Sequence, residues 1–415
     1  MRERAMLKIG LLTHSVNPRG GVVHTVELAE ALQEAGHEVT VMAPALPGER
    51  LFRDVSCAVE LVEVPERAAD TTQMIRMRIA AYVSHLSAPL ATLASGRRSD
   101  RFDVLHAQDG IGGNALASLR ERSVIRGYVR TVHHVDHFDD PAIEALEARA
   151  IRRARNVVCV SEMWRQALAG DYGVSATVIR NGVNRRRFAA LAALAAAGDL
   201  DVAAGDPRVA RRLGLKPGAP LIVCVGGIEE RKNTVRILQA FQRLRRRFPR
   251  AQLAVVGGAS LLDHSCYRAS FDAVLRASGL GAGAGRDVVI TGPVRDADLP
   301  GVLRLADAVA FPSVREGFGL VALEALACGT PTVVSRIAPF TEYLSDGDVE
   351  WADPLDVESI AAALESAVSR GKFAPPRVCE RYNWSGSAAA HVALYRAFVA
   401  AVAAIAPRLE FIADA

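Results

Sequence analysis

Short apolar runs alternate with amphipathic helical segments along the sequence, and this alternation restricts the fold more than any other feature. An apolar run at 8–16 is followed by the turn 17–21, a helical pattern at 22–36 and a second apolar run at 37–44. Apolar residues that recur every three or four positions indicate a helix, and short apolar runs indicate buried strands. A strand, helix, strand unit of this kind crosses over in the right-handed sense. It therefore predicts a parallel sheet with ligands at the carboxyl ends of its strands.

The alternation stops and then restarts, which predicts two domains. The stretch 185–216 is rich in Arg, Ala, Gly and Asp, and a new buried strand pattern begins at 219–225. We therefore expect an α/β protein with a first Rossmann-like domain over 1–184, a connector over 185–216 and a second Rossmann-like domain over 217–383. The 415 residues are enough for two such domains facing one another across a cleft, with an active site between them.

Composition excludes several classes of protein. With 50% hydrophobic and 23% charged residues, the chain has the balance of a folded globular protein. No apolar run reaches the length of a membrane-spanning helix, and the first residues lack the cleavage site of a signal peptide, so we expect a cytoplasmic protein. The net charge of +4 is small and shows no basic lobe, which argues against nucleic acid as a partner. The scattered cysteines indicate small buried side chains rather than a metal or redox site.

The first loop of interest is Asn17–Gly21, which follows the first predicted strand and opens a helix. Backbone amides at such a helix start favour an anion, and Gly20 and Gly21 let a phosphate or a sugar come close. A nicotinamide site is the obvious competitor, but the pattern G-x-G-x-x-G is absent and no acidic residue ends the second strand. A tight turn without a ligand is the other interpretation.

A second loop, 226–233, lies at the equivalent place in the second domain. It contains Gly227, Arg231 and Lys232 between a buried strand and a helix. Both cations could pair with a diphosphate, Lys as a point charge and Arg through its planar fork. A solvated helix start is the alternative. The sequence uses Arg almost everywhere in place of Lys, the exceptions being Lys8, Lys216, Lys232 and Lys372, so a Lys kept in this loop is a candidate functional residue.

The strongest local signal is the segment 311–335, FPSVREGFGLVALEALACGTPTVVS. Glu316 lies in the loop after a predicted strand, and Glu324 lies inside the helix that follows. Two carboxylates so placed could bind sugar hydroxyls and a ribose. The amides of Gly317 and Gly319, on either side of Phe318, could hold phosphate charge.

Histidines and aspartates gather at 131–140. A metal site is one interpretation, but the H-E-x-x-H arrangement is absent and no helical pattern places the ligands on one face. We expect instead that His133 reaches from a strand end as a hydrogen-bond partner, and that no metal is bound. The side chains considered for a metal are His133, His134, Asp136, His137, Asp139 and Asp140. We expect His14, His24, His37 and His106 to be ordinary satisfied or exposed histidines.

With these motifs, the chain resembles the retaining GT-B glycosyltransferases of family 4 over nearly its whole length. The resemblance rests on Gly20–Gly21, DVLHAQD, TVHH, VIRNGVNRRRF, VGGIEERKN and EGFGLVALE. The paired glutamates of that family, separated by seven residues, correspond to Glu316 and Glu324. At NPRGGVVH and GGIEERKN the chain is also similar to an uncharacterised bacterial subgroup.

The resemblance implies a role for each site residue. Glu316 would contact the donor sugar, Glu324 the nucleotide ribose and Lys232 the diphosphate, with His133 beside the sugar. It makes His133, Glu316 and Lys232 the catalytic candidates, and it implies that a final segment from about 384 to 415 packs back on the first domain. The donor-binding set that it implies is Gly20, Gly21, Gly227, Arg231, Lys232, Val294, Arg295, Glu316, Gly317, Phe318, Gly319, Leu320 and Glu324.

Two positions depart from the family pattern. Family members usually carry Arg where this chain has Gly227, so Arg231 would have to take its place or Lys232 and the helix start would hold the diphosphate. The second His of the H-x-H motif after the fourth strand is Gln108 here.

The function that follows is transfer of a hexose from a nucleoside diphosphate sugar to an acceptor hydroxyl with retention, without metal or cofactor. The alternatives are another GT-B enzyme, such as a sugar-nucleotide epimerase or a phosphorylase, and a nucleotide-sugar-binding protein without catalysis. The acceptor could be a sugar, a lipid or a small molecule.

The segment 71–98 has apolar residues at helical spacing and several Arg. It could touch the inner membrane face peripherally, although a helix packed on the sheet is the simpler interpretation.

Overall fold

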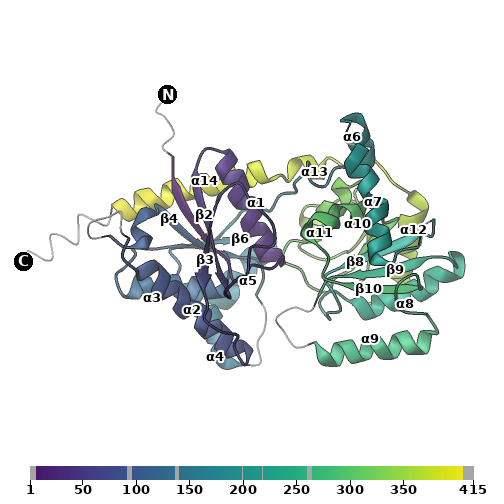
Figure 1. Ribbon diagram of the computed structural model, residues 1–415, viewed down its shortest axis with the longest axis horizontal. Coiled ribbons are helices and arrows are strands. Elements are labelled where there is room, and N and C mark those ends of the chain that lie inside the picture. Colours follow the sequence, from purple (N-terminus) through teal and green to yellow (C-terminus); the bar gives the residue numbers. More distant parts are fainter. Residues whose placement is uncertain are drawn as a thin grey trace, which may run out of the picture. The chain divides into compact units, whose positions relative to one another are not determined.

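The computed structural model describes residues 6–90, 96–135, 140–198, 200–216, 218–258 and 264–404 of the chain (Figure 1). It divides into two α/β units. The first comprises residues 1–182 together with 384–415, and the second comprises residues 183–383. The chain therefore passes from the first unit to the second after Gly182 and returns after Asn383.

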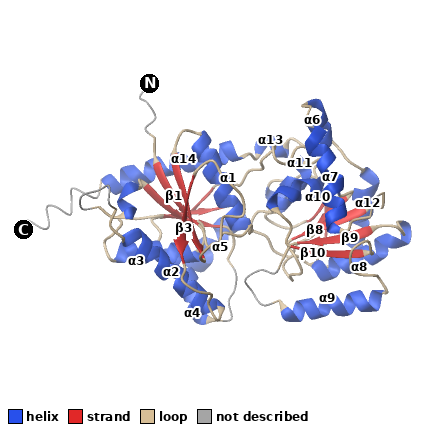
Figure 2. Ribbon diagram, in the orientation of Figure 1, coloured by secondary structure: helices blue, strands red, loops and turns tan. Residues whose placement is uncertain are grey.

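The first unit is built on a seven-stranded sheet in the order β3-β2-β1-β4-β5-β6-β7 (Figure 2). Every pair of neighbouring strands is parallel. The order reverses between β1 and β4, and this is the place where parallel sheets usually bind ligands. The strands are β1 (Lys8–Leu12), β2 (Glu38–Ala45), β3 (Ala58–Glu63), β4 (Val104–Ala107), β5 (Val129–Val132), β6 (Asn156–Cys159) and β7 (Ala176–Val178).

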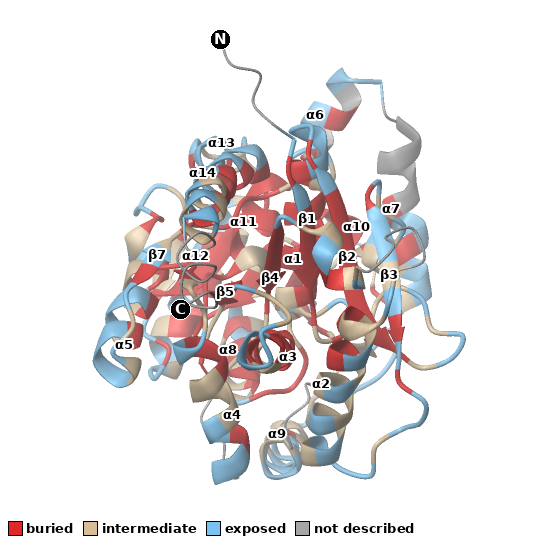
Figure 3. Cartoon of the chain, turned by 90° about the vertical axis from the view of Figure 1, so that its left-hand side faces the viewer, coloured by how far each residue is buried: buried red, intermediate tan, exposed pale blue. Residues whose placement is uncertain are grey.

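Helices cover this sheet. Among the described residues they are α1 (Gly20–Glu34), α2 (Thr71–Ser87), α3 (Gly110–Glu121), α4 (Pro141–Arg152), α5 (Glu162–Tyr172) and α14 (Trp384–Ala403), with a 3₁₀ turn at Arg98–Arg101. Figure 3 shows the central strands β1 and β4 buried, whereas much of α5 is exposed. Leu12, Met42, Leu105 and Leu116 belong to the apolar core of this unit.

The segment 71–98 contributes to that core. Its helix α2 buries Tyr82, Val83 and Leu86 and packs beside α3. This observation supports the interpretation of a helix packed on the unit rather than one free to lie on a membrane; residues 91–95 lie outside the described part of the chain.

The last described helix, α14, belongs to the first unit and packs against α1 and β4. In the described part of the chain it is also the one helix long and apolar enough to cross a membrane by length and composition. Its buried residues include Trp384, His391, Tyr395 and Phe398. One face of α14 is therefore part of the core.

The second unit has a six-stranded parallel sheet in the order β10-β9-β8-β11-β12-β13. The strands are β8 (Leu221–Val225), β9 (Gln252–Val256), β10 (Val288–Gly292), β11 (Ala308–Phe311), β12 (Thr332–Ser335) and β13 (Glu350–Ala352). The helices are α6 (Leu191–Ala196), α7 (Leu200–Leu213), α8 (Thr234–Arg247), α9 (Ser265–Ser278), α10 (Leu299–Leu305), α11 (Leu320–Ala327), α12 (Val357–Arg370) and α13 (Val378–Arg381), with 3₁₀ turns at Asp296–Asp298 and Phe340–Glu342.

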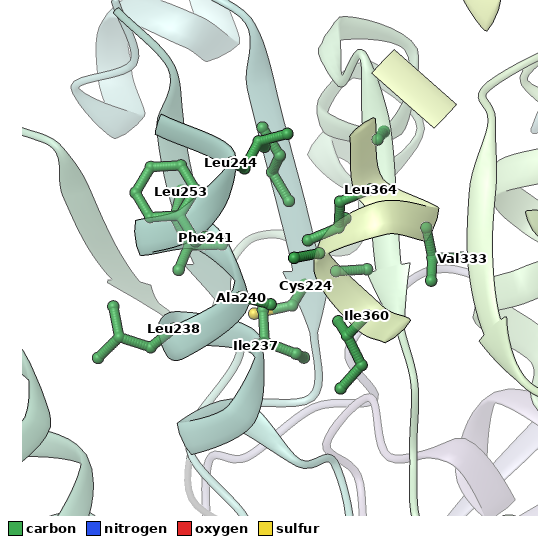
Figure 4. Packing of buried hydrophobic residues seen from close by; sticks show 14 of the residues in the cluster. Cys224, Ile237, Leu238, Ala240, Phe241, Leu244, Leu253, Val333, Ile360 and Leu364 are labelled. Atoms are coloured by element: carbon green, nitrogen blue, oxygen red, sulfur yellow. The ribbon is translucent and has the colours of Figure 1, made fainter. Parts of the chain in front are cut away.

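Two helices bury the core of this unit against the sheet (Figure 4). Helix α8 contributes Phe241 and Leu244, and α12 contributes Ile360 and Leu364. The predicted strand and helix alternation, and the predicted α/β class with two Rossmann-like parallel sheets, are confirmed by this arrangement.

The stretch 185–216 differs from the separate connector that its composition predicts. It contains α6 and α7 and belongs to the second unit. Asp206 on α7 accepts two hydrogen bonds from the Arg304 guanidinium on α10, at 2.7 and 2.8 Å, and both side chains are buried. Because a buried ion pair holds only in good geometry, this pair fixes α7 on the second unit.

Candidate active site

A cluster of charges lies at the carboxyl edge of the second sheet. Lys232, in the loop between β8 and α8, places its Nζ 2.6 Å from Oε1 of Glu316. Arg231 donates to the same oxygen from NH1 at 2.9 Å. Glu316 is only 7% exposed, Lys232 14% and Arg231 30%. Two cations therefore share one buried carboxylate.

Sheet topology explains why these distant residues meet. Strands β8 and β11 are parallel neighbours, so the loops that follow Val225 and Phe311 leave the sheet at the same edge. The amide of Val314 donates to the carbonyl of Arg231 at 3.0 Å, which ties the two loops together. Burial lowers the pKa of Lys232, and the Glu316 carboxylate opposes this shift. The ammonium also lies 4.3 Å from the centre of the Phe311 ring.

The glycines of the loop 226–233 have a packing role. Gly227 has φ +77°, and a Cβ there would lie 2.5 Å from the carbonyl oxygen of Gly258. A Cβ at Gly226 would meet Cε of Lys232 at 2.8 Å, so the Lys232 side chain runs across this glycine. No larger residue fits at 227 without moving the backbone. The backbone therefore leaves no room for a side chain at 227, and Arg231 brings a guanidinium to Glu316 from elsewhere in the same loop.

The loop 312–319, between β11 and α11, is held by aromatic packing. Phe318 stacks on Tyr343 at 4.6 Å, and the Tyr343 hydroxyl donates to the carbonyl of Phe318 at 2.8 Å. Gly319 has φ +90°, and a Cβ there would lie within 2.4 Å of the Phe340 ring. Helix α11 begins at Leu320, and Glu324 is buried inside it. These contacts fix the backbone on both sides of Gly317.

Val294 and Arg295, two members of the predicted donor-binding set, follow β10 at the same edge of the sheet. Val294 is partly exposed. Arg295 donates from Nε and NH2 to the carboxylate of Asp298, at 2.9 and 3.1 Å, and its side chain is 68% exposed. The structure therefore places both residues at this edge but shows no contact between Arg295 and the charge cluster around Glu316.

A second candidate site lies in the first unit, where β5 ends and α1 begins. A Cβ built on Gly21 would lie 3.4 Å from Cδ2 of His133, so the start of α1 passes directly over this imidazole. Gly20 is the first residue of the helix. Burial lowers the pKa of His133 well below its usual range, with a further contribution from His24. Its Nε2 is buried and has no hydrogen-bond partner among the described residues.

His24 is a residue of this site that the sequence reasoning missed. Its ring meets that of His133 edge to face at 4.5 Å and that of Trp384 at 5.2 Å. Its Nδ1 lies 3.0 Å from Oδ1 of Asn181. Since an amide oxygen only accepts, Nδ1 carries the proton and Nε2 is the bare nitrogen. His24 lies one turn after Gly21, and that helical spacing was the available signal.

Two further histidines extend this buried group. His391 on α14 lies 5.7 Å from His106, ring to ring. His106 is bonded at both nitrogens, to the hydroxyls of Tyr395 and Thr131, each at 2.7 Å. The expectation of a satisfied histidine is thus confirmed for His106. Burial lowers the pKa of His24 to about 3 and that of His391 to about 4, so both are neutral imidazoles.

Within the described residues, no group of three metal-ligating side chains lies close enough to hold an ion. Asp136, His137 and Asp139, which the metal interpretation of 131–140 needs, fall outside those residues. Asp140 instead caps α4, and its carboxylate accepts a hydrogen bond from the Thr72 hydroxyl at 2.8 Å.

Two models of known protein families match the sequence of this chain. The family model "Glycosyl transferases group 1" matches residues 206–381, and the model "Glycosyltransferase Family 4" matches residues 18–187. An uncharacterized glycosyltransferase of Methanocaldococcus jannaschii is 25% identical over 94% of this chain and 98% of its own length. A phosphatidyl-myo-inositol mannosyltransferase of Mycolicibacterium smegmatis is 28% identical over 91% of each chain.

Among solved structures, sucrose-phosphate synthase from Thermosynechococcus elongatus matches with a TM-score of 0.73 at 20% identity. The match covers 95% of this chain and all of that one. The group 1 model matches a segment of the second unit that contains Lys232 and Glu316. The family 4 model matches a segment that lies almost wholly in the first unit and contains His133. The chain belongs to the group 1 glycosyltransferases of family 4 and has the GT-B fold.

Proposed function

We propose that the protein transfers a hexose from a nucleoside diphosphate sugar to an acceptor hydroxyl, with retention at the anomeric carbon. The observation that carries this proposal is the ion-paired triad of Lys232, Arg231 and Glu316 at the carboxyl edge of the second sheet. A second buried carboxylate, that of Glu229, lies 3.8 Å from NH2 of Arg231, so two carboxylates balance the two cations. A diphosphate could accept hydrogen bonds from both Lys232 and Arg231 if it took the place of the Glu316 carboxylate between them.

The triad also accounts for catalysis in this proposal. When the bond between the sugar and the diphosphate breaks, negative charge grows on the leaving nucleoside diphosphate. Lys232, Arg231 and the amides near Gly317 and Gly319 are fixed before the reaction and stabilise that charge. A diphosphate that pairs with the two cations frees Glu316 to accept hydrogen bonds from sugar hydroxyls. Glu324 would hold the ribose, and His133 would donate or accept a hydrogen bond at the sugar.

Retention is proposed to follow from departure and attack on the same face of the sugar, through an oxocarbenium-like state. We also propose that turnover needs neither a metal nor a cofactor, because Lys232 and Arg231 supply the positive charge. Proton NMR of the first product would show the anomeric configuration. Activity that disappears with a chelator and returns with a divalent ion would contradict the metal-free proposal.

The decisive experiment measures nucleoside diphosphate release from a panel of uridine, guanosine and adenosine diphosphate sugars, with the wild type and Glu316→Ala. We expect release from at least one donor by the wild type and its loss in the variant, with the variant still folded. A phosphorylase would need free phosphate and no nucleotide. An epimerase would change the sugar without release, and a binding protein would bind a donor without turnover. Turnover at the wild-type rate by Glu316→Ala would refute the proposal.

We propose a cytoplasmic protein whose acceptor is a hydroxyl compound. The relative named for phosphatidyl-myo-inositol suggests a lipid acceptor as one form of that compound. Sedimentation with vesicles of anionic phospholipid tests the peripheral membrane contact considered for the segment 71–98. Since α2 buries Tyr82, Val83 and Leu86 within the first unit, we expect the protein to stay in the supernatant.

A further inference from the structure

His24 is a buried side chain of the first unit to which the proposed function gives no role. It lies about one turn into α1, and only 1% of it is exposed. Its neighbours come from three other places in the chain: His133 after β5, Asn181 after β7 and Trp384 at the start of α14. A residue with such contacts can fix the position of one neighbour against the other two.

The hydrogen bond to Asn181 sets the orientation of the His24 imidazole. Nδ1 of His24 donates to Oδ1 of Asn181 over 3.0 Å, and both side chains are buried. A hydrogen bond between two buried side chains weakens steeply when its angle changes, so only a narrow range of ring orientations is favourable. The plane of the His24 ring is therefore defined by a residue outside α1.

Ring contacts join His24 to its two other neighbours. Its centroid lies 4.5 Å from that of His133 at an interplanar angle of 68°, and 5.2 Å from that of Trp384 at 73°. Rings at these distances and angles make favourable edge-to-face contacts. In the described part of the chain, His24 is the one aromatic ring that contacts His133. The buried Nε2 of His133 has no hydrogen-bond partner there, so packing has to hold this end of the ring.

The first turn of α1 closes over the same imidazole. Gly21 lies against His133, with 3.4 Å between a Cβ built on the glycine and Cδ2 of the ring. The Thr25 hydroxyl donates to the carbonyl of Gly21 at 2.7 Å, which holds this turn from within the helix. His24 holds the same turn from outside, through Asn181 and Trp384.

Asn181 and Trp384 lie next to the two places where the chain crosses between the units. The first stretch of the unit ends one residue after Asn181, and its second stretch begins at Trp384. Between these points, the amide of Val183 donates to the carbonyl of Tyr382 at 3.0 Å, so the two crossing segments lie side by side. Both partners that orient His24 are thus anchored at paired segments of backbone.

We propose that His24 is a positioning residue for His133: its ring, oriented by Asn181 and Trp384, holds the His133 imidazole in place for the transfer reaction. This inference rests on the proposed function, because it takes His133 to meet the sugar. His24 then acts on the reaction through His133 alone. Its loss should lower kcat, leave nucleotide binding unchanged and have no effect on turnover once His133 is removed. A residue that only stabilises the fold would not show this dependence.

Two variants separate positioning from stability. His24→Phe keeps an aromatic ring but loses the donor, and it leaves Oδ1 of Asn181 buried without a partner, which lowers stability. Adding Asn181→Leu removes that unpaired oxygen. We expect His24→Phe to lower kcat about tenfold with an unchanged Kd for nucleoside diphosphate, and the double variant to regain thermal stability but not kcat. His37→Phe is the matched control, since His37 is a buried imidazole bonded to the amide of Leu7 at 3.2 Å.

The first measurement is nucleoside diphosphate release at saturating donor, with and without His133. In a His133→Ala background, adding His24→Phe should change the residual release by less than about twofold, because the two residues act as one unit. The second measurement needs no activity. In proton–nitrogen correlation NMR of the imidazoles, the His133 signals are assigned by their loss in His133→Gln. They should shift in His24→Phe and in Asn181→Leu and stay unchanged in His37→Phe.

Several results would overturn the inference. They are a wild-type kcat in His24→Phe, an equal loss with and without His133, full recovery of kcat by Asn181→Leu, and His133 signals that do not move. Wild-type turnover by His133→Ala would overturn it too, since there would be no catalytic imidazole to position. A wild type that neither binds nor cleaves any nucleotide sugar would instead refute the proposed function, and the NMR measurement would still decide whether His24 holds the His133 ring.

Discussion

The candidate sites of the two units hold their polar groups in opposite ways. In the second unit, Lys232 and Arg231 are charged and already paired with Glu316. In the first unit, His24 and His133 are neutral, and each has a buried Nε2 without a partner among the described residues. A ligand of the second unit must therefore replace an existing ion pair, whereas a ligand of the first unit can add hydrogen bonds to groups that lack them.

Desolvation explains this difference. A buried charge is tolerated only with a partner, so Lys232 and Arg231 need the Glu316 carboxylate. A buried histidine has another solution, because it can lose its proton and remain neutral. The charged site can thus recognise an anion, and the neutral one can recognise hydroxyls. The predictions below test this contrast, from the largest expected effect to the smallest.

Glu316→Gln should separate binding from catalysis. Transfer should fall by a factor of about 10² to 10³, the usual effect of removing one fixed polar group at a transition state. Binding of free nucleoside diphosphate, measured by titration calorimetry, should become tighter, because Gln no longer competes for Lys232 and Arg231. Glu350→Gln, which removes a carboxylate from β13 of the same unit, should change neither quantity. Weaker nucleotide binding in Glu316→Gln would show that Glu316 does not compete with the phosphate.

Lys232→Met should remove the central cation and keep the length of the side chain. We expect nucleoside diphosphate affinity to fall by about 10-fold to 100-fold, as for the loss of a hydrogen bond to a charged group. Lys216→Met is the matched control, since Lys216 pairs with Asp287 at 3.4 Å and is 35% exposed. An equal loss of affinity in both variants would mean that general positive charge, and not the triad, attracts the nucleotide.

The sequence predicted the elements of the charged site better than its contacts. Lys232 and Glu316 each follow an apolar strand pattern and precede a helix, so their place at a sheet edge could be inferred. Their ion pair joins residues that are 84 positions apart in the sequence. The two side chains meet only because β8 and β11 are neighbouring strands. Neither apolar pattern nor spacing states which strands are neighbours.

The same limit explains the two larger misses. His24 looked ordinary because its neighbours Trp384 and His391 come from a helix 360 or more residues further along the chain. Residues 185–216 were predicted to be a helical or loose connection between domains because they are rich in Arg, Ala, Gly and Asp; the structure has helices there but makes them part of the second unit. The contact that fixes them, between Asp206 and Arg304, spans 98 positions. Local composition describes a segment's own preference, and packing against distant elements decides the outcome.

The neutral site should make the first unit sensitive to acid. The folded-state pKa values of His24 and His391, about 3 and about 4, lie below the value of 6.5 for an unfolded histidine. The unfolded chain therefore binds more protons between these values. Stability is fully present above pH 6.5 and is lost as the pH falls below it, by up to about 1.4 kcal/mol per pH unit for each group.

Urea unfolding between pH 7 and pH 4 measures this loss of stability. His24→Phe and His391→Phe should each reduce the slope of unfolding free energy against pH, whatever they do to stability at pH 7. His37→Phe is a weaker comparison, because burial lowers the pKa of His37 as well. An unchanged slope in His24→Phe would show that this imidazole is not held neutral. The description of the first unit's site as neutral would then be wrong.

Arg231→Gln should have the smallest effect, because this cation is the most exposed member of the triad. Its side chain is 30% exposed, against 14% for Lys232, so water and salt screen it more strongly. We expect a loss of nucleoside diphosphate affinity of about twofold to fivefold at low ionic strength, which is the range of exposed or partly exposed ion pairs. The loss should shrink as salt is added, whereas the loss in Lys232→Met should persist. If salt removes both losses equally, the two cations share one solvated environment and the buried pair of Lys232 and Glu316 is not what distinguishes this site. If Arg231→Gln instead loses as much nucleoside diphosphate affinity as Lys232→Met at every salt concentration, Arg231 binds the diphosphate in place of the arginine that family members usually carry at position 227.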